Sequence, residues 1–334
     1  PMSPRLSVVV ISYNIPRELP RTLYSLSPAF QRGIAADDYE VVVVDNGSKH
    51  PPTEEEHREL GANLRILRNP DPHPSPVGAI NFGLAEARGE AIAVFIDGAR
   101  LASPGLLRAS LQALQISPRA VVGSRGRYLG SDFQSAAMRR GYTREKEDQL
   151  LESVSWRENG YNLFQISVFD ESSIASWFTP IAESNSVCMS RAMWKELGGY
   201  DPQFSAAGGG MANLDVWKRA IVLPDAVPIV LLGEATFHQL HGGSSTNAAE
   251  PMARGLVVAE EYRAIRGESF RISDTPLHYW GTFVQPPLRR ELLGDPFSPQ
   301  AWRMKYEYVR FMLKVRLGLM EHPTGGKSTM VPPW

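Results

Sequence analysis

The sequence is poor in cysteine and has no excess of charge of either sign. The single cysteine, Cys188, excludes an internal disulfide, and its place in an apolar run favours an inert buried thiol over a nucleophile. Lysine and arginine number 35 against 36 aspartates and glutamates, so the formal net charge is −1. Such a balance offers no electrostatic capture of nucleic acid, and we expect no nucleic-acid partner.

Long hydrophobic runs and a dinucleotide-binding turn are also missing. No segment is long enough to span a bilayer, and the N-terminus lacks the apolar stretch of a signal peptide, so we expect a cytoplasmic protein. The turn after the first apolar run contains no Gly-x-Gly-x-x-Gly, which argues against a dinucleotide fold. It also lacks the glycine-rich turn with basic residues that nucleotidyltransferases place there.

The sequence does contain an alternation of strand and helix patterns. Short apolar runs, many of them β-branched, predict strands at residues 6–12, 39–44, 64–67, 91–96, 120–124, 186–189 and 227–232. In the first half these runs alternate with helical patterns through short links, which predicts a mostly parallel sheet with right-handed crossovers. The 334 residues suffice for one large α/β domain with an extension, or for two domains.

Two of the predicted strands end in an acidic residue, Asp45 and Asp97. Parallel sheets bind ligands outside the carboxyl ends of their strands, and a carboxylate there needs a cation, a hydroxyl or backbone donors. We therefore predict that Asp45 and Asp97 lie at the same edge of the sheet. Asp97 either faces a ligand there or only caps the turn into the next helix.

Two segments depart from the alternation. Residues 126–180 are predicted to form an insertion beside the ligand cleft, with a helix at 143–158, or else a plain surface excursion. Residues 251–334 are predicted to form a helical C-terminal extension. Within it, residues 302–320 combine basic and large apolar side chains, which permits peripheral docking at the inner face of a membrane. A packing helix or a homodimer contact are the alternatives.

Six short motifs follow one another in order between Leu6 and Ser245. They are Val-Val-Val-Ile-Ser-Tyr-Asn ending at Asn14, Val-Val-Val-Val-Asp-Asn-Gly-Ser ending at Ser48, Gly78-x-x-Asn81-x-Gly83-Leu84, Phe-Ile-Asp-Gly-Ala around Asp97, Gly-Gly-Tyr-Asp ending at Asp201, and His-x-x-His-Gly-Gly-Ser starting at His238. Each motif alone is weak, but the ordered set resembles the family 2 glycosyltransferases of the GT-A fold.

The resemblance implies a fold and an activity. The fold is a GT-A-like α/β domain at residues 1–250, whose mostly parallel, Rossmann-like sheet is flanked by helices. Residues 1–125 would form the nucleotide-binding half and residues 126–250 the acceptor-side half. The activity is transfer of a sugar, with inversion, from a nucleoside-diphosphate sugar to a hydroxyl of a carbohydrate or glycoconjugate acceptor in polysaccharide or glycoconjugate synthesis. The rival interpretations are a catalytically impaired binding or scaffold protein of the same fold, and a nucleotidyltransferase.

The resemblance also implies roles for the matching positions. The residues of the nucleotide pocket would be Ser12, Tyr13, Asn14, Asp45, Ser48 and Asn81. Among them, Asp45 would accept a hydrogen bond from the base, and Asn81 would hold the nucleotide or close the loop over it. Asp97 would meet the ribose or the metal-bound diphosphate. His238 or His241 would approach the diphosphate as a further metal ligand or a direct donor, and the sequence does not decide between them.

Two positions depart from the family pattern. The second acid of the usual Asp-x-Asp is replaced by Ala99, so Asp97 with a histidine makes a poor cage for Mg²⁺ or Mn²⁺ unless substrate phosphates add oxygen ligands. The usual base position is occupied by Asn213, which cannot take a proton. The acids that remain as candidate bases are Asp215, Asp201 and Glu183. Asp215 is also expected to stabilise the N-terminus of its helix.

Overall fold

The computed structural model describes residues 4–61, 63–173, 176–242 and 251–283, together with positions 288, 306, 309, 310 and 313. The strands are β1 (Leu6–Ser12), β2 (Tyr39–Asp45), β3 (Leu64–Arg68), β4 (Ala91–Phe95), β5 (Arg100–Ala102), β6 (Ala120–Leu129), β7 (Ser167–Phe169), β8 (Val187–Ser190), β9 (Val227–His238) and β10 (His278–Gly281). The α-helices are α1 (Leu19–Leu26), α2 (Val77–Glu86), α3 (Leu106–Leu114), α4 (Gln134–Arg139), α5 (Arg144–Glu152), α6 (Arg191–Leu197), α7 (Ala212–Ile221) and α8 (Pro251–Arg266). Short 3-10 helices are η1 (Ala36–Asp38), η2 (Glu55–Leu60), η3 (Gly160–Ile166), η4 (Glu171–Ser173) and η5 (Ala207–Gly209).

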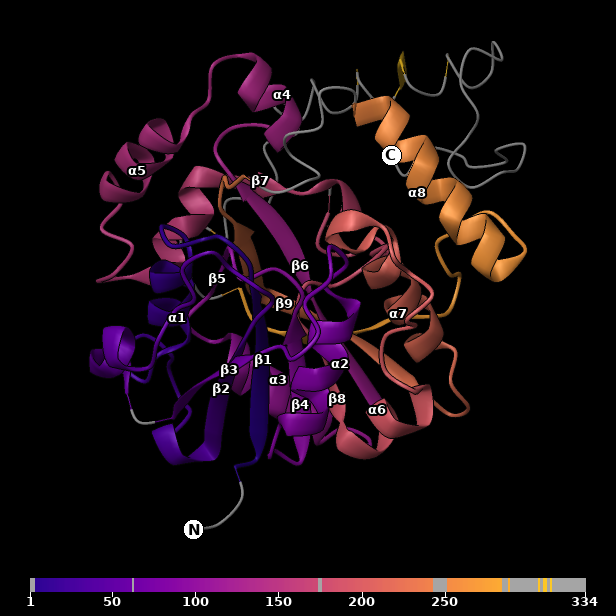
Figure 1. The fold of residues 1–334 in the computed structure, drawn as a ribbon, viewed down its shortest axis with the longest axis horizontal. Helices are drawn as coiled ribbons and strands as arrows, with labels where there is room; N and C mark the ends of the chain where they lie inside the picture. The colour runs from indigo at the N-terminus through magenta and orange to yellow at the C-terminus, as the bar shows by residue number, and fades with distance from the viewer. Residues whose placement is uncertain are drawn as a thin grey trace.

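The strands form one twisted sheet in the order β10-β9-β6-β8-β4-β1-β2-β3 (Figure 1). Neighbouring strands are parallel except for β8, which runs antiparallel to both β4 and β6. The short strands β5 and β7 pair antiparallel with β9 and β6. This arrangement confirms the prediction of a mostly parallel α/β sheet flanked by helices.

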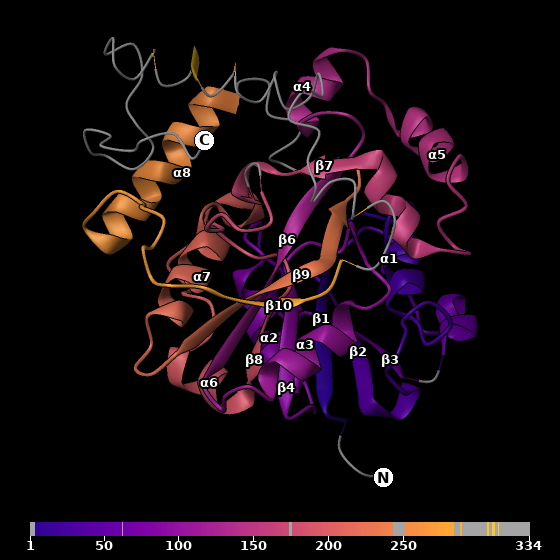
Figure 2. The same ribbon diagram turned by 180° about the vertical axis from the view of Figure 1, so that it is seen from behind.

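Hydrophobic residues pack on both faces of the sheet because successive strand residues point to opposite sides. On one face, Val9 and Val44 pack with residues of α2, α6 and α7. On the other face, Val8 and Val10 pack with residues of α1 and α3. Figures 1 and 2 show these layers from opposite sides. Such two-sided burial explains why the strands read as continuous apolar runs.

Two strands are longer than the sequence predicted. β6 continues to Leu129 and β9 to His238, whereas apolar runs predicted ends at residues 124 and 232. The extra residues of β6 include the buried, polar Arg125 and Arg127, and β9 passes through Gly233 at a φ of +75°. Polar residues and a glycine interrupt the apolar pattern, so the strand signal ended too early.

The inserted segment contributes a third apolar cluster. Its helix α5 spans Arg144–Glu152, shorter than the predicted 143–158. The following residues instead supply aromatic side chains, among them Phe164 and Trp177, which pack with Phe237 of β9. In both figures, α4 and α5 lie at the end of the sheet that is farther from the N-terminus. The insertion is therefore anchored through its own core.

The C-terminal segment begins with a helix, as predicted, but also adds a strand. Tyr262 of α8 is 1% exposed and packs into the cluster under α7, and β10 pairs with β9. The predicted amphipathic helix at 302–320 lies outside the described residues apart from four isolated positions. Among the residues that the structure describes, no helix combines the length and apolarity needed to cross a membrane.

Helix α2 carries two glycines with opposite surroundings, which allows a matched stability test. A Cβ at Gly83 would lie 2.5 Å from Val9 Cγ1 and 3.0 Å from Val44 Cγ2, whereas a Cβ at Gly78 would meet nothing within 4 Å. Both substitutions to alanine share the same gain in helix propensity. We expect Gly83→Ala to be less stable than Gly78→Ala by about 1–3 kcal/mol, the usual cost of overpacking. Denaturant unfolding measures the difference, and equal free energies of unfolding would contradict the close packing of α2 on the sheet.

Candidate active site at the carboxyl edge of the sheet

The pairing of β1 brings the predicted acids to one edge. Ser12, the last residue of β1, is the partner of Asp45 on β2, and Val10 is the partner of Phe95 on β4. Asp97 follows Phe95 by two residues, so it lies beyond the same end of the sheet. The structure thus places Asp45 and Asp97 on the two sides of β1 at its carboxyl end, as the sequence predicted.

The loops after β1 and β2 are bonded to each other. Asn14 donates its backbone N–H to Ser48 Oγ at 2.9 Å, and Asn14 Oδ1 accepts from the Lys49 N–H at 2.9 Å. Asn14 has a φ of +51°, a left-handed conformation that asparagine tolerates better than most residues. These bonds hold Tyr13 at the edge, where its side chain is 58% exposed.

Asp45 has one bonded and one unbonded carboxylate oxygen. Oδ2 accepts from the backbone N–H groups of Gly47 and Ser48 at 3.3 and 3.1 Å. Oδ1 is buried and has no hydrogen-bond partner among the described residues. A buried acceptor left without a partner costs free energy, so this oxygen can accept a hydrogen bond from water or another molecule.

Asp97 lies in a cluster with both candidate histidines. Its Oδ1 accepts from the Ala99 N–H at 2.9 Å, which caps the turn after β4. Its Oδ2 lies 2.8 Å from His238 Nε2 and 3.2 Å from His241 Nε2, and the two ring nitrogens are 3.1 Å apart. One oxygen of Asp97 thus caps the turn and the other faces the histidines, and contact of Asp97 with a ligand stays a prediction.

The surroundings shift the pKa values of Asp97, His238 and His241 in different directions. Burial opposes the charge of Asp97, but the attraction of His241 and the hydrogen bonds of the two histidines outweigh it and hold the pKa of Asp97 well below its usual value. Burial and the nearby charge of Arg100 lower the pKa of His238 to about 4. Burial also acts against the charge of His241, yet Asp97 raises the pKa of His241 above its usual value. At neutral pH His238 is therefore neutral, whereas Asp97 favours the protonated form of His241.

The same three residues offer converging ligand atoms for a metal ion, all within 4.8 Å of one another. They do not fit Mg²⁺ or Mn²⁺ well, because these ions prefer oxygen and the set holds two imidazoles for one carboxylate. The remaining ring nitrogen of His238, Nδ1, is buried and has no hydrogen-bond partner among the residues that the structure describes, whereas a metal-bound imidazole normally donates through its second nitrogen. Arg100 adds a positive charge, with its Nε 4.0 Å from Asp97 Oδ2.

The insertion braces the histidine segment. Glu147 of α5 accepts from the Leu240 N–H at 2.8 Å, and Arg17 donates to the Leu240 carbonyl at 3.1 Å. Leu240 precedes His241, so α5 positions the end of this segment. The contacts support the prediction that the insertion lies beside the ligand edge.

Asn213, at the position where the family pattern has a base, is bonded to the carboxylate of Glu183. Its Nδ2 donates to Glu183 Oε2 at 2.8 Å, and its Oδ1 accepts from the Tyr200 hydroxyl at 2.8 Å. The other oxygen of Glu183 accepts from Ser172 at 2.8 Å. Burial, and then the charge of Asp170, raise the pKa of Glu183. A partly exposed, weakly acidic carboxylate therefore lies directly beside the position where a base was expected.

The other candidate bases are bonded to arginine. Asp215 is 1% exposed and accepts from Arg219 at 2.7 Å and from Arg266 at 2.6 and 2.8 Å. Asp201 pairs with the same Arg266 at 2.8 Å. These contacts join α7 to α8, so they favour a structural role for both acids over proton transfer.

Asn81 is engaged within the protein. Its side chain accepts from the Tyr200 N–H at 2.9 Å and donates to the Tyr200 carbonyl at 2.8 Å. It therefore fastens α2 to the loop before α7, which supports a loop-holding role over direct contact with a nucleotide.

Arg100, the first residue of β5, was not among the predicted site residues. It is 8% exposed and close to Asp97. The sequence did contain a sign that Arg100 belongs to the site, because it is a charged residue directly after Asp97-Gly98-Ala99 in a mostly apolar stretch. A strand as short as β5 leaves no periodic pattern, so the inward direction of Arg100 was not predictable.

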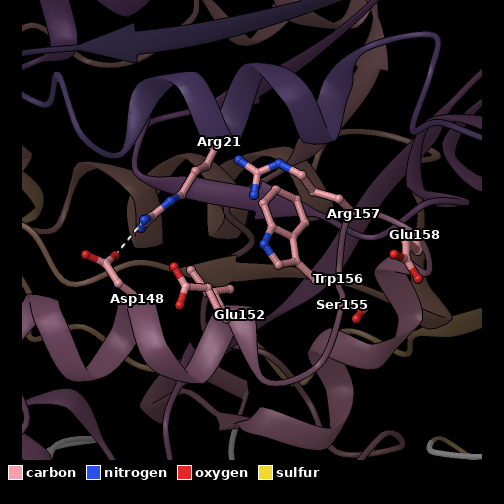
Figure 3. A pocket seen from close by; sticks show the side chains of 8 residues that line it. Arg21, Asp148, Glu152, Ser155, Trp156, Arg157 and Glu158 are labelled. Carbon is pink, nitrogen blue, oxygen red and sulfur yellow. Dashed lines mark hydrogen bonds and ion pairs between the residues drawn. The ribbon is translucent and has the colours of Figure 1, made fainter.

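A pocket of about 360 Å³ lies between α1 and the segment around α5 (Figure 3). Its lining residues are Arg21, Asp148, Leu151, Glu152, Ser155, Trp156, Arg157 and Glu158. None of them was predicted as a site residue. The ion pair of Arg21 with Asp148, at 2.5 Å, holds the insertion against α1, and we assign the pocket no role in the site.

Comparison with known proteins adds a family and several structural likenesses. A model of the family described as glycosyl transferase family 2 matches residues 7–176, just over half of the chain. A search of curated proteins finds no match.

Solved structures of S. aureus TarS are similar to this chain. The first TarS structure is 15% identical to this chain, with a TM-score of 0.45. The match covers 79% of this chain and 44% of the TarS chain. TarS 1–349 in complex with UDP is 14% identical, with coverage of 79% and 72% and a TM-score of 0.46. The complex with UDP-GlcNAc is 14% identical, with coverage of 78% and 66% and a TM-score of 0.47. The match thus takes in less than half the length of the first structure.

The protonation states of the cluster can be measured by NMR titration of the imidazole rings. We expect His238 to titrate near pH 4 and His241 above its usual value. In Asp97→Asn, His241 loses the attraction of the carboxylate but stays buried, so the pKa of His241 should fall below 6.5. His57 is the internal control, because burial lowers its pKa and only Glu56 and Glu59 oppose that shift. An unchanged His241 in Asp97→Asn would contradict the cluster.

Proposed function

The chain belongs to glycosyl transferase family 2, and we propose that it moves a sugar from a nucleoside-diphosphate sugar to a hydroxyl of a carbohydrate or glycoconjugate acceptor. Polysaccharide or glycoconjugate synthesis is the process that such a transfer would serve. The observation that carries the proposal is the grouping of Asp45, Tyr13 and Asp97 at the carboxyl edge, where parallel sheets bind ligands.

The nucleoside half of the donor fits the loops after β1 and β2. The unbonded Oδ1 of Asp45 would accept the ring N–H of uracil, thymine or guanine, which would remove the cost of a buried acceptor without a partner. The exposed ring of Tyr13 would stack on the base. Ser12, Asn14 and Ser48 would shape the pocket through the bonds that join the two loops.

We propose Glu183 as the general base of an inverting transfer. The acceptor oxygen would form a bond to the anomeric carbon while the bond to the diphosphate breaks, and the acceptor proton would pass to Glu183. Asn213 would orient Glu183 through its 2.8 Å hydrogen bond. The charge of Arg100 acts on both Glu183 and His238, so the carboxylate is within electrostatic reach of the Asp97 cluster.

A catalytically impaired binding protein of the same fold is the second candidate. Ala99 and Asn213 favour it, because both replace acids of the family pattern. Release of free nucleotide from a nucleotide sugar would exclude this candidate.

The proposed nucleoside site predicts a defined loss of affinity in Tyr13→Ala. Stacking of a base on an aromatic ring contributes about 1–3 kcal/mol, so we expect UDP or another nucleoside diphosphate to bind roughly 5- to 150-fold more weakly. Isothermal titration calorimetry with UDP, GDP and dTDP measures the effect. Trp280→Ala is the matched control, because Trp280 is a 40% exposed aromatic residue in β10, away from β1 and β2. If none of the three nucleotides binds the wild-type protein, the proposed function is wrong.

The proposed base predicts a rate effect in Glu183→Gln. General base catalysis contributes about 10²- to 10⁴-fold, and we expect a loss of turnover in this range with little change in nucleotide affinity. Wild-type turnover should rise with pH through the raised pKa of Glu183, since the ionised form is the base, and Glu183→Gln should lack this rise. Release of nucleotide from the bound sugar donor is the assay. Glu90→Gln, an exposed position at the other end of β4, should retain full activity.

A further inference from the structure

We propose that Arg100 binds the diphosphate of the donor, in the place where the family pattern provides a second acid and a divalent metal ion. Donor binding then requires no metal. This inference rests on the proposed function, because it names the group that neutralises the leaving diphosphate in the same site.

The sheet places Arg100 in a row with two residues of the site. Arg100 of β5 is the partner of His238 on β9, and His238 is the partner of Tyr128 on β6. Cross-strand partners have their side chains on the same face of a sheet, and the rings of His238 and Tyr128 are 5.7 Å apart. Arg100 therefore extends on the face that carries the Asp97 cluster.

The guanidinium of Arg100 is buried, and two of its nitrogens have no hydrogen-bond partner among the described residues. The side chain is 10% exposed, and neither Nε nor Nη1 has a partner in the part of the chain that the structure describes. Its nearest carboxylate oxygen, Asp97 Oδ2, is 4.0 Å from Nε and is already bonded to two histidines. Buried charged groups are normally paired, so these two nitrogens indicate a site for an anionic ligand.

The neighbouring carboxylates do not form hydrogen bonds with Nε or Nη1 of Arg100. The charge of Arg100 lowers the pKa of Asp170 and Glu183 against the larger effect of burial, so both lie within electrostatic reach. The described hydrogen bonds of Asp170 go to Ser173, and those of Glu183 go to Ser172 and Asn213. Arg100 therefore attracts both carboxylates electrostatically, while its Nε and Nη1 have no hydrogen-bond partner among the described residues.

The chemistry of the cluster favours a diphosphate over a metal ion. A planar guanidinium binds two phosphate oxygens at once through parallel N–H groups. The charge of Arg100 lies 4.0 Å from the Asp97 oxygen that would hold a metal ion, so it attracts an anion and opposes the binding of a divalent cation there. Arg100 follows Ala99, the position of the missing acid, so a fixed positive charge lies next to Asp97 in a site that lacks the second metal-binding carboxylate.

Calorimetry with inorganic pyrophosphate in EDTA tests this site directly. We expect the wild-type protein to bind pyrophosphate, and to bind UDP equally well in EDTA and in Mn²⁺. Arg100→Gln should weaken both ligands about 10- to 150-fold, the range for hydrogen bonds to a charged group, and should leave the affinity for uridine unchanged. Arg100→Lys should retain part of the affinity, because it keeps the charge and loses the planar fork.

Two controls separate the possible failures. Arg119→Gln removes an arginine that precedes β6 at the other end of the sheet and pairs with Glu196, and it should bind as the wild type does. Circular dichroism and thermal unfolding show that each variant is folded. If UDP binding is lost in EDTA, or is unchanged in folded Arg100→Gln, the inference is wrong while the proposed function stands. If pyrophosphate binding depends on Arg100 but UDP, GDP and dTDP do not bind, the proposed function is wrong and the anion site stands.

Discussion

The parallel pairing of β1 with both β2 and β4 is the constraint on which the site depends. It aligns three strand ends, so that Ser12, Asp45 and Asp97 arrive at one edge although they are far apart in the chain. The pairing is stabilised by apolar side chains on both faces, because alternate valines of β1 enter two different cores. A shift by one residue would exchange the two faces and move the acids out of line, so packing and site geometry depend on the same register.

Charge at this edge is arranged differently from the family pattern. Asp97 is bonded to two histidines. Arg100, which lies close to Asp97, directly follows Ala99, the position at which the family pattern has a second acid. Asn213 carries no charge but is hydrogen-bonded to the carboxylate of Glu183. The two substitutions are thus accompanied by nearby groups of the chemical type that a transfer needs, a cation for the diphosphate and a carboxylate for the proton. This compensation is the reason we favour an active transferase over a binding protein.

Much of the polar structure around the site serves to hold it in shape. Asp215 and Asp201 are bonded to Arg219 and Arg266, which fastens α7 to α8. Asn81 fastens α2 to the loop at Tyr200. Removing one partner from such a buried ion pair is costly. These residues belong to recognisable motifs, so a motif by itself does not separate a residue that touches substrate from one that supports the wall.

The sequence by itself determined the class of fold, the order of its main strands and the two acids at the strand ends, because buried parallel strands leave uninterrupted apolar runs. It left open the choice between His238 and His241, and it left Asp215, Asp201 and Glu183 together as candidate bases. Tertiary structure decided which partners these side chains have, since β5, β9 and the insertion bring together residues more than a hundred positions apart. Direction and pairing of polar side chains depend on such long-range contacts, which no local pattern records.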